Sequence, residues 1–78
     1  MKNVTAVNGA GVDPVTLGQR IRHLRRTRNL TLADLASQVG SASSALSTIE
    51  NGRREPRLSL LQSIAGALDV SVEDLLRT

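Results

Sequence analysis

The segment from Leu32 to Asn51, LADLASQVGSASSALSTIEN, constrains the possible folds of this chain more than any other. Its first half has an apolar stripe at helical spacing, formed by Leu35, Ala36 and Val39. Gly40 follows directly, at a point where a helix end favours a residue that tolerates positive φ. A second apolar stripe precedes the Asn-Gly pair and consists of Ala42, Leu46 and Ile49. The segment predicts two short helices, about 32–39 and 42–50, joined by a tight turn.

The segments on either side predict three further helices. Asp13 and Pro14 form a favourable helix start, with Thr16 and Gln19 as a competing capping box, and we expect this helix to extend to about Arg28. Its apolar stripe is Leu17, Ile21 and Leu24, and Asn29 is suited to end it. The fourth helix is expected to bury Leu58, Leu61, Ile64, Ala65 and Leu68, and a short fifth helix Val72, Leu75 and Leu76.

Capping chemistry supports two of these helix starts. Thr31 with Asp34, and Ser71 with Asp74, each have the spacing of a capping box. No segment shows the alternation of a strand, so the expected fold class is all-α, a compact bundle of five helices. Residues 1–12 have no usable periodicity and are expected to be a flexible arm, with or without a role on a partner; residues 13–78 are the expected folded domain.

Composition excludes several functional classes. The 78 residues include no cysteine, so neither a disulfide nor a thiolate metal site is expected, which fits a reducing cytoplasm. No aromatic residue is present to stack on single-stranded bases. No apolar run is long enough for a membrane span. The single histidine, His23, has no second metal ligand at helical spacing, and no serine has a base nearby in the pattern of a catalytic site. We therefore expect no enzyme, no cofactor and no metal.

The helix expected at 42–50 has a hydroxyl-rich face opposite its apolar stripe, made of Ser43, Ser44, Ser47 and Thr48. Short hydrogen-bonding side chains suit a helix that enters the major groove of DNA, because hydroxyls reach base edges and a threonine methyl can contact thymine. The alternative is that these residues only solvate an exposed face. The tight turn before this helix and the basic residues after it favour a DNA-binding helix-turn-helix.

Positive charge is concentrated in the first part of the chain. Up to Arg57 there are nine Lys or Arg against four acidic residues, whereas the remainder has one arginine against three. One surface is therefore expected to be basic and another acidic. The candidates for contact with the DNA backbone are Thr31, Asn51, Arg53, Arg54 and Arg57. For Arg20, Arg22, Arg26 and Arg28 both a backbone contact and simple solvation stay open.

Two charged residues lie on otherwise apolar stripes. Arg25 follows the stripe of the first helix, and Glu50 lies on the apolar side of the third. Since a lone buried charge is costly, we expect a partly buried ion pair between them. The alternative is that each side chain extends independently into water.

The segments LGQRIRHLRRTRNLTLADLASQVG and SSALSTIENGRREPRLSLLQSIAGALDVSVEDLL closely resemble the Cro/C1-type (XRE) helix-turn-helix family over about Thr16 to Leu76. The resemblance implies a lambda-repressor-like domain of bacterial or phage transcriptional regulators, with its third helix in the major groove. It implies a homodimer on a palindromic operator, and it places the base and backbone contacts on the candidates named above. Arg25 and Glu50 fall on positions that are paired in similar repressors.

Three departures from the family pattern matter. Leu32 replaces a common glutamine, Ser41 replaces an apolar turn residue, and the hydroxyl-rich face has no Gln, Asn or Arg before Asn51. We therefore expect modest base discrimination, helped by DNA shape. A competing interpretation is an antitoxin-like or adaptor module that binds a protein through the acidic last helices. The ending after the last helix leaves open a minimal regulator, paired through Val72, Leu75 and Leu76, or the first part of a longer protein with an effector domain.

Overall fold

Five α-helices make up the part of the protein that the computed structural model describes, residues 13–77. The helices are α1 (Pro14–Thr27), α2 (Leu32–Val39), α3 (Ser43–Glu50), α4 (Leu58–Ala67) and α5 (Val72–Leu76). No strand occurs among these residues, which confirms the predicted all-α class. The arm expected at residues 1–12 lies outside the described residues.

The helix starts follow the local side-chain chemistry. The Asp13 carboxylate accepts the backbone N–H of Val15 at 3.2 Å and the hydroxyl of Thr16 at 2.9 Å, so α1 begins at Asp13 and not at the competing capping box. At α2 the Thr31 hydroxyl accepts the N–H of Asp34 at 3.0 Å, and the Asp34 carboxylate accepts the N–H of Thr31 at 2.9 Å. The same reciprocal capping box forms at the start of α5 between Ser71 and Asp74. Both predicted boxes are confirmed.

The helix ends use left-handed residues. Gly40, Asn29 and Asp69 have φ of 68°, 58° and 59°, and each lies just beyond a helix. The first two were expected from the sequence. After α4, the N–H of Val70 donates to the carbonyl of Ala65, which closes the turn around Asp69. Aspartate is less common than glycine or asparagine at such helix ends, so the left-handed conformation of Asp69 was not predicted from the sequence.

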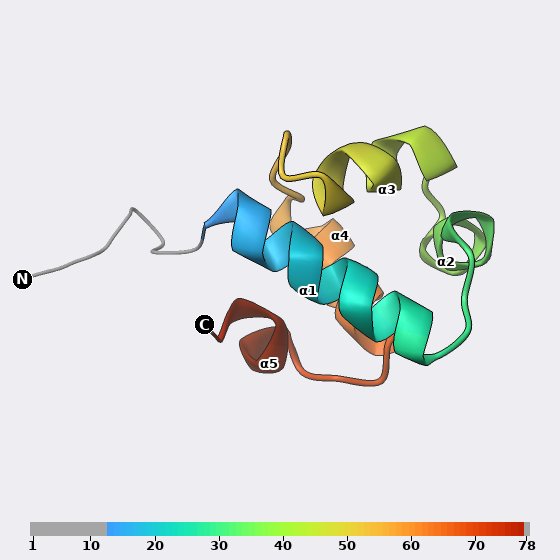
Figure 1. Ribbon diagram of the computed structural model, residues 1–78. Coiled ribbons are helices and arrows are strands. Elements are labelled where there is room, and N and C mark those ends of the chain that lie inside the picture. The colour runs from blue at the N-terminus through green and yellow to red at the C-terminus, as the bar shows by residue number, and fades with distance from the viewer. Residues whose placement is uncertain (1–12, 78) are drawn as a thin grey trace, which may run out of the picture.

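The core is aliphatic throughout. Helix α1 crosses the middle of the molecule, with α3 along one side, α5 along another and α4 behind it, while α2 packs between α3 and α4 (Figure 1). The side chains that fill the centre are Leu17, Ile21, Leu35, Ala36, Leu46, Ile49, Leu61, Ile64, Ala65, Leu68 and Leu75. Because α1 and α2 both pack against α3, the two fix its orientation.

Two expectations about burial need correction. Leu58 is 64% exposed, because it is the first residue of α4 and extends beyond the core. Ala42 is exposed as the N-cap of α3 and is not part of the buried stripe. Leu75 is buried in the core, as expected, whereas Val72 and Leu76 of the suggested pairing patch keep partial exposure.

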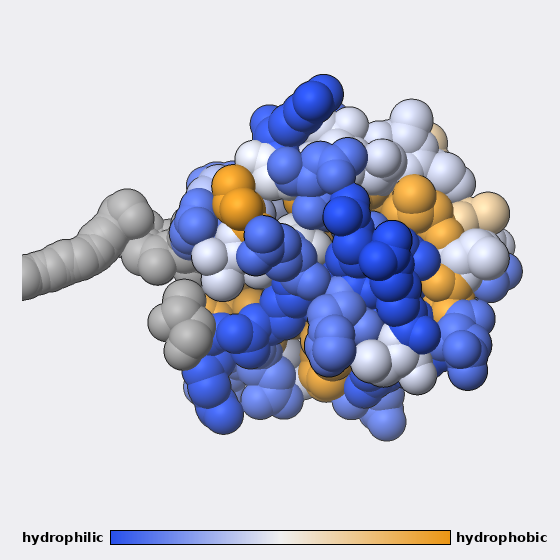
Figure 2. Space-filling model, viewed as in Figure 1, coloured by the Kyte–Doolittle hydropathy of each residue, from blue (hydrophilic) through white to orange (hydrophobic). Residues whose placement is uncertain are grey.

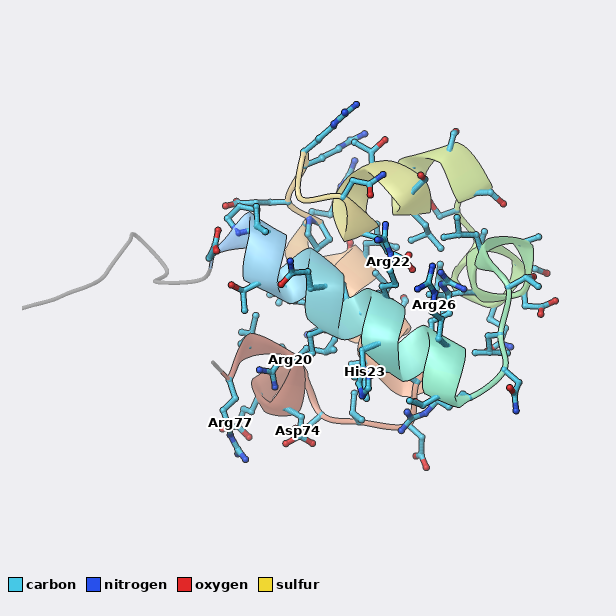
Figure 3. The ribbon with its side chains drawn as sticks, viewed as in Figure 1. Arg20, Arg22, His23, Arg26, Asp74 and Arg77 are labelled. Carbon is cyan, nitrogen blue, oxygen red and sulfur yellow. The ribbon has the colours of Figure 1, made fainter. Side chains whose placement is uncertain are left out.

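The charge separation is also less complete than the sequence suggested. Arg20 of α1 reaches the acidic end of the molecule, where its Nη1 donates to the Asp74 carbonyl at 3.2 Å. Arg77 lies 3.8 Å from the Asp74 carboxylate. Figure 3 shows Arg20, Asp74 and Arg77 together beside α5. The acidic surface of α5 is therefore partly neutralised by arginines.

Candidate nucleic-acid interface

The hydroxyl-rich side of α3 is its accessible side. Ser43 and Ser44 are exposed and Ser47 and Thr48 are half-buried, whereas Leu46 and Ile49 on the opposite side are in the core. The Thr48 hydroxyl donates to the Ser44 carbonyl at 2.9 Å, so its proton is used within the helix. Its lone pairs and methyl group remain for outside contacts. The two exposed serines keep both donor and acceptor capacity.

The turn after α3 is held against the start of α1. The N–H of Gly52 donates to the Ile49 carbonyl at 3.0 Å and the N–H of Arg53 to the Thr48 carbonyl at 3.1 Å. Gly52 has φ of 75°, and a Cβ on it would lie 2.8 Å from Cα of Val15. Only glycine satisfies both the positive φ and this close approach. The turn therefore leaves α3 in a fixed direction.

Three arginines extend from this turn without competing partners. Arg53, Arg54 and Arg57 are exposed, and none of them has an ion pair or side-chain hydrogen bond among residues 13–77. Figure 2 shows a strongly hydrophilic surface over this turn and over α1 on the viewed face. Arg54 and Arg57 also line a cleft of about 400 Å³ between the end of α2, α3 and the start of α4. Their guanidinium groups remain available to an external anion.

The ion pair expected between Arg25 and Glu50 is present and buried. Nε of Arg25 lies 2.7 Å from Oε2 of Glu50, and its Nη2 lies 3.0 Å from Oε1. The two residues are 8% and 3% exposed. The hydrogen bonds to Glu50 raise the pKa of Arg25 above its already high ordinary value. Since Nη1 of Arg25 also donates to the Leu30 carbonyl at 2.8 Å, the pair fixes α1, the α1–α2 turn and α3 together.

Arg22 joins this network, which the sequence did not indicate. Its Nε donates to Oε1 of Glu50 at 3.3 Å and its Nη2 to Oδ1 of Asn51 at 2.6 Å. Arg22 and Arg25 lie three residues apart on α1, and that spacing is the one available signal that both arginines face α3. Asn51 is thereby connected to the buried pair.

The remaining candidates are divided between two places. Thr31 is exposed at the start of α2, where its hydroxyl accepts the backbone N–H of Asp34 and caps the helix. Arg26 points to the same side as Arg22, whereas Arg20 lies toward α5 (Figure 3). Within the described part of the chain no cluster of His, Cys, Asp and Glu has the arrangement of a metal site. No helix there has the length and apolar character needed to span a membrane.

Comparison with known proteins places these features in a family. The family described as "Helix-turn-helix domain" matches residues 16–77. The immunity repressor protein of Bacillus phage phi105 is 43% identical over 58 residues, which cover 74% of this chain and 40% of the repressor. The HTH-type transcriptional regulator SinR of Bacillus subtilis is 41% identical over 61 residues, covering 77% of this chain and 55% of SinR. The chain thus spans about half the length of the curated relatives it matches.

Solved structures show the same arrangement of helices. The clp gene regulator ClgR from Corynebacterium glutamicum superposes with a TM-score of 0.80 at 35% identity, covering 83% of this chain and 69% of ClgR. SinR, the master regulator for biofilm formation, superposes in its complex with DNA with a TM-score of 0.75 at 39% identity. That match covers 78% of this chain and 98% of the SinR chain.

Proposed function

This chain belongs to the helix-turn-helix domain family, and from that membership we propose that it binds double-stranded DNA with sequence preference, as a transcriptional regulator of repressor type or as the DNA-binding part of one. The observation that carries the proposal is the outer side of α3. Exposed and half-buried hydroxyls line a helix that leads directly into a turn whose three arginines have no partners among the described residues. The proposed site of action is the cytoplasm, where bacterial and phage DNA is transcribed.

In the proposed complex, α3 lies in the major groove. Ser43 and Ser44 contact base edges, with Ser47 and Thr48 adding a second row through lone pairs and the threonine methyl. Arg53, Arg54 and Arg57 bind phosphates, as do Asn51 and the start of α2 at Thr31. Each group assigned to DNA is at least partly accessible from outside, whereas Arg25 is buried and has a structural role.

The base discrimination expected of this surface is modest. Hydroxyls at the exposed start of α3 make single hydrogen bonds, whereas bidentate recognition of guanine or adenine needs a guanidinium or a carboxamide. No such group precedes Asn51 on α3. We therefore expect sequence preference to arise partly from the shape and deformability of the DNA.

Binding as a homodimer to an inverted repeat is part of the proposal. In helix-turn-helix repressors the two-fold symmetry of the protein matches half-sites about one helical turn apart. The phi105 relative is named a repressor, and SinR has been crystallised with DNA. An effector domain beyond the present chain is compatible with its matching 40% and 55% of these two relatives.

Selection from a pool of random-sequence duplexes tests the proposal. The protein is titrated against the pool at two salt concentrations, and the retained duplexes are sequenced. Recovery of an inverted repeat supports a dimeric regulator, and the slope of log affinity against log salt counts phosphate contacts at about 0.9 each. Absence of retention at low salt contradicts the proposal.

A protein partner is the second candidate function. SinR is also known in a complex with the SinI protein, and Leu58, at 64% exposure, is the most exposed large apolar side chain among residues 13–77. A partner that binds apolar surface at Leu58 would not need the charge of Arg53, Arg54 or Arg57. Loss of DNA retention on removal of these arginines therefore separates DNA binding from this alternative.

A further inference from the structure

The two arginines that contact Glu50 differ in what they leave free. Arg25 uses Nε and Nη2 on the carboxylate and Nη1 on the Leu30 carbonyl, and its side chain is 9% exposed. Arg22 uses only Nε on the carboxylate and Nη2 on Asn51, and its side chain is 36% exposed. Its Nη1 has no partner within residues 13–77. Two guanidinium groups thus share one carboxylate, and the accessible one of the two is Arg22.

Arg22 also determines which way the Asn51 amide faces. Because Oδ1 of Asn51 accepts from Arg22 at 2.6 Å, Nδ2 is on the other side of the amide, 3.5 Å from Oγ of Ser47. Asn51 is exposed at the end of α3. An amide held in this way presents N–H donors, and not its oxygen, to an approaching anion. The guanidinium of Arg22 lies beside this amide, because its Nη2 contacts Oδ1 of Asn51, and among the described residues its remaining N–H groups are free to bind the same anion.

We propose that Arg22 and Asn51 form a clamp for one phosphate of the DNA backbone, in which Arg22 both supplies charge and fixes the donor side of the Asn51 amide. The inference rests on the proposed function and adds to it a residue on α1. The buried Arg25–Glu50 pair supports the clamp, since it holds the end of α3 at Glu50 against α1, with 2.7 Å between Nε of Arg25 and Oε2 of Glu50. Figure 3 shows Arg22 on the side of α1 that faces α3, and its Nη2 contacts Oδ1 of Asn51, the residue directly after α3.

The test is a salt titration against the random-sequence duplex pool, because a phosphate is present on every duplex. R22M is expected to weaken retention roughly ten-fold, as for loss of a charge-assisted hydrogen bond, and to lower the salt slope by about 0.9. N51A is expected to weaken retention without changing the slope, since an amide displaces no counterion. In the R22M background N51A then has little further effect, because its amide has lost its orientation.

The matched control is R20M. R20M makes the same change from arginine to methionine on the same helix, but Arg20 contacts α5 and not α3. In the R20M background N51A is expected to weaken retention as much as it does in the wild type. R20M alone is expected to change the salt slope little. Thermal unfolding of each variant verifies that the fold persists.

Two conservative variants keep the test independent of stability. N51D retains the oxygen that accepts from Arg22, so its melting temperature is expected to stay at or above the wild-type value while its affinity for the duplex pool falls at least ten-fold. R22K retains the charge without the guanidinium fork. It is expected to keep the salt slope, but N51A is expected to have little further effect in its background, because lysine does not orient the Asn51 amide.

The outcomes separate the clamp from the proposed function. Wild-type protein that is not retained on duplexes overturns both. Wild-type retention with R22M and R20M equal in slope, or with a full N51A effect in the R22M background, overturns the clamp and leaves DNA binding intact.

Discussion

Glu50 is 3% exposed and accepts hydrogen bonds from two arginines of α1. Glu50→Ala is expected to destabilise the fold by about 3–5 kcal/mol, because it leaves Arg25 buried without a counter-charge. Arg25→Met is expected to cost less, since Arg22 still neutralises the carboxylate and methionine fills apolar space. Urea denaturation of both variants measures the difference.

A double-mutant cycle decides whether the pair acts as a unit. Combining Arg25→Met with Glu50→Ala removes both charges, so the combined loss is expected to fall well below the sum of the two single losses. Additive losses would mean that the two side chains stabilise the protein independently, in spite of their 2.7 Å contact.

The sequence was sufficient to predict the pairing of Arg25 with Glu50, but not the participation of Arg22. Arg25 and Glu50 stand out because each interrupts an apolar stripe, and the structure pairs them. Arg22 does not stand out, because it lies beside the stripe and its partners are 28 and 29 positions away. The geometry between two helices is needed to see that one carboxylate serves two arginines.

At the scale of elements, the crossing of α1 and α3 depends on a single glycine. A Cβ on Gly18 would lie 2.4 Å from the Ile49 carbonyl oxygen and 2.5 Å from that of Glu50. Gly18→Ala is therefore expected to destabilise the protein by about 1–3 kcal/mol, as α3 must shift away. Chemical denaturation measures the loss.

Gly66 supplies the matched control on α4. A Cβ there would meet no atom within 4 Å, so Gly66→Ala is expected to stabilise the protein by about 0.5–1 kcal/mol through helix propensity. Equal effects of the two substitutions would show that propensity, and not the helix crossing, governs Gly18.

The capping boxes predict a specific acid sensitivity. Hydrogen bonds from the backbone N–H and hydroxyl of Thr31 hold the pKa of Asp34 below its ordinary value of 3.8, and Ser71 does the same for the pKa of Asp74. A folded pKa below the unfolded one gives stability that is complete above pH 3.8 and is lost as the pH falls through the folded pKa. Asp34→Asn is expected to be less stable than wild type at neutral pH, with the difference vanishing in acid.

Urea midpoints across a pH series measure this convergence. Asp69→Asn is the control, because it removes an exposed aspartate whose side chain makes no capping hydrogen bond among residues 13–77, and asparagine tolerates the left-handed conformation at the end of α4. A constant gap between Asp34→Asn and wild type down to low pH would contradict the linkage to the cap.

The helix starts and most helix ends were predictable because their signals are local. Caps and left-handed residues act within four positions of one another, so the sequence alone contains the interaction. Burial at helix ends is not local. Leu58 continues the helical period of α4, but no neighbouring helix extends far enough to cover it, and the sequence therefore predicted a buried position wrongly.

At the scale of the whole molecule, the proposed DNA contacts are divided between two surfaces. The turn after α3 is expected to contact phosphates and to set the affinity, whereas α3 is expected to contact bases and to set the sequence preference. The arginines of the turn after α3 are exposed and lack partners among the described residues, so replacing Arg53, Arg54 and Arg57 by glutamine changes the net charge from +3 to 0 at little structural cost. The expected change in unfolding free energy is within about 0.5 kcal/mol.

On DNA, this triple variant is expected to lose about 0.9 in salt slope for each arginine that contacts a phosphate, while the sequence recovered by selection stays the same. The complementary variant, Ser43→Ala with Ser44→Ala, carries no charge change. It is expected to keep the slope and broaden the recovered sequence, because base edges and not phosphates distinguish one duplex from another. If the serine variant left the recovered sequence unchanged while the arginine variant altered it, base selection would lie in the turn, and α3 would be only the support that positions it.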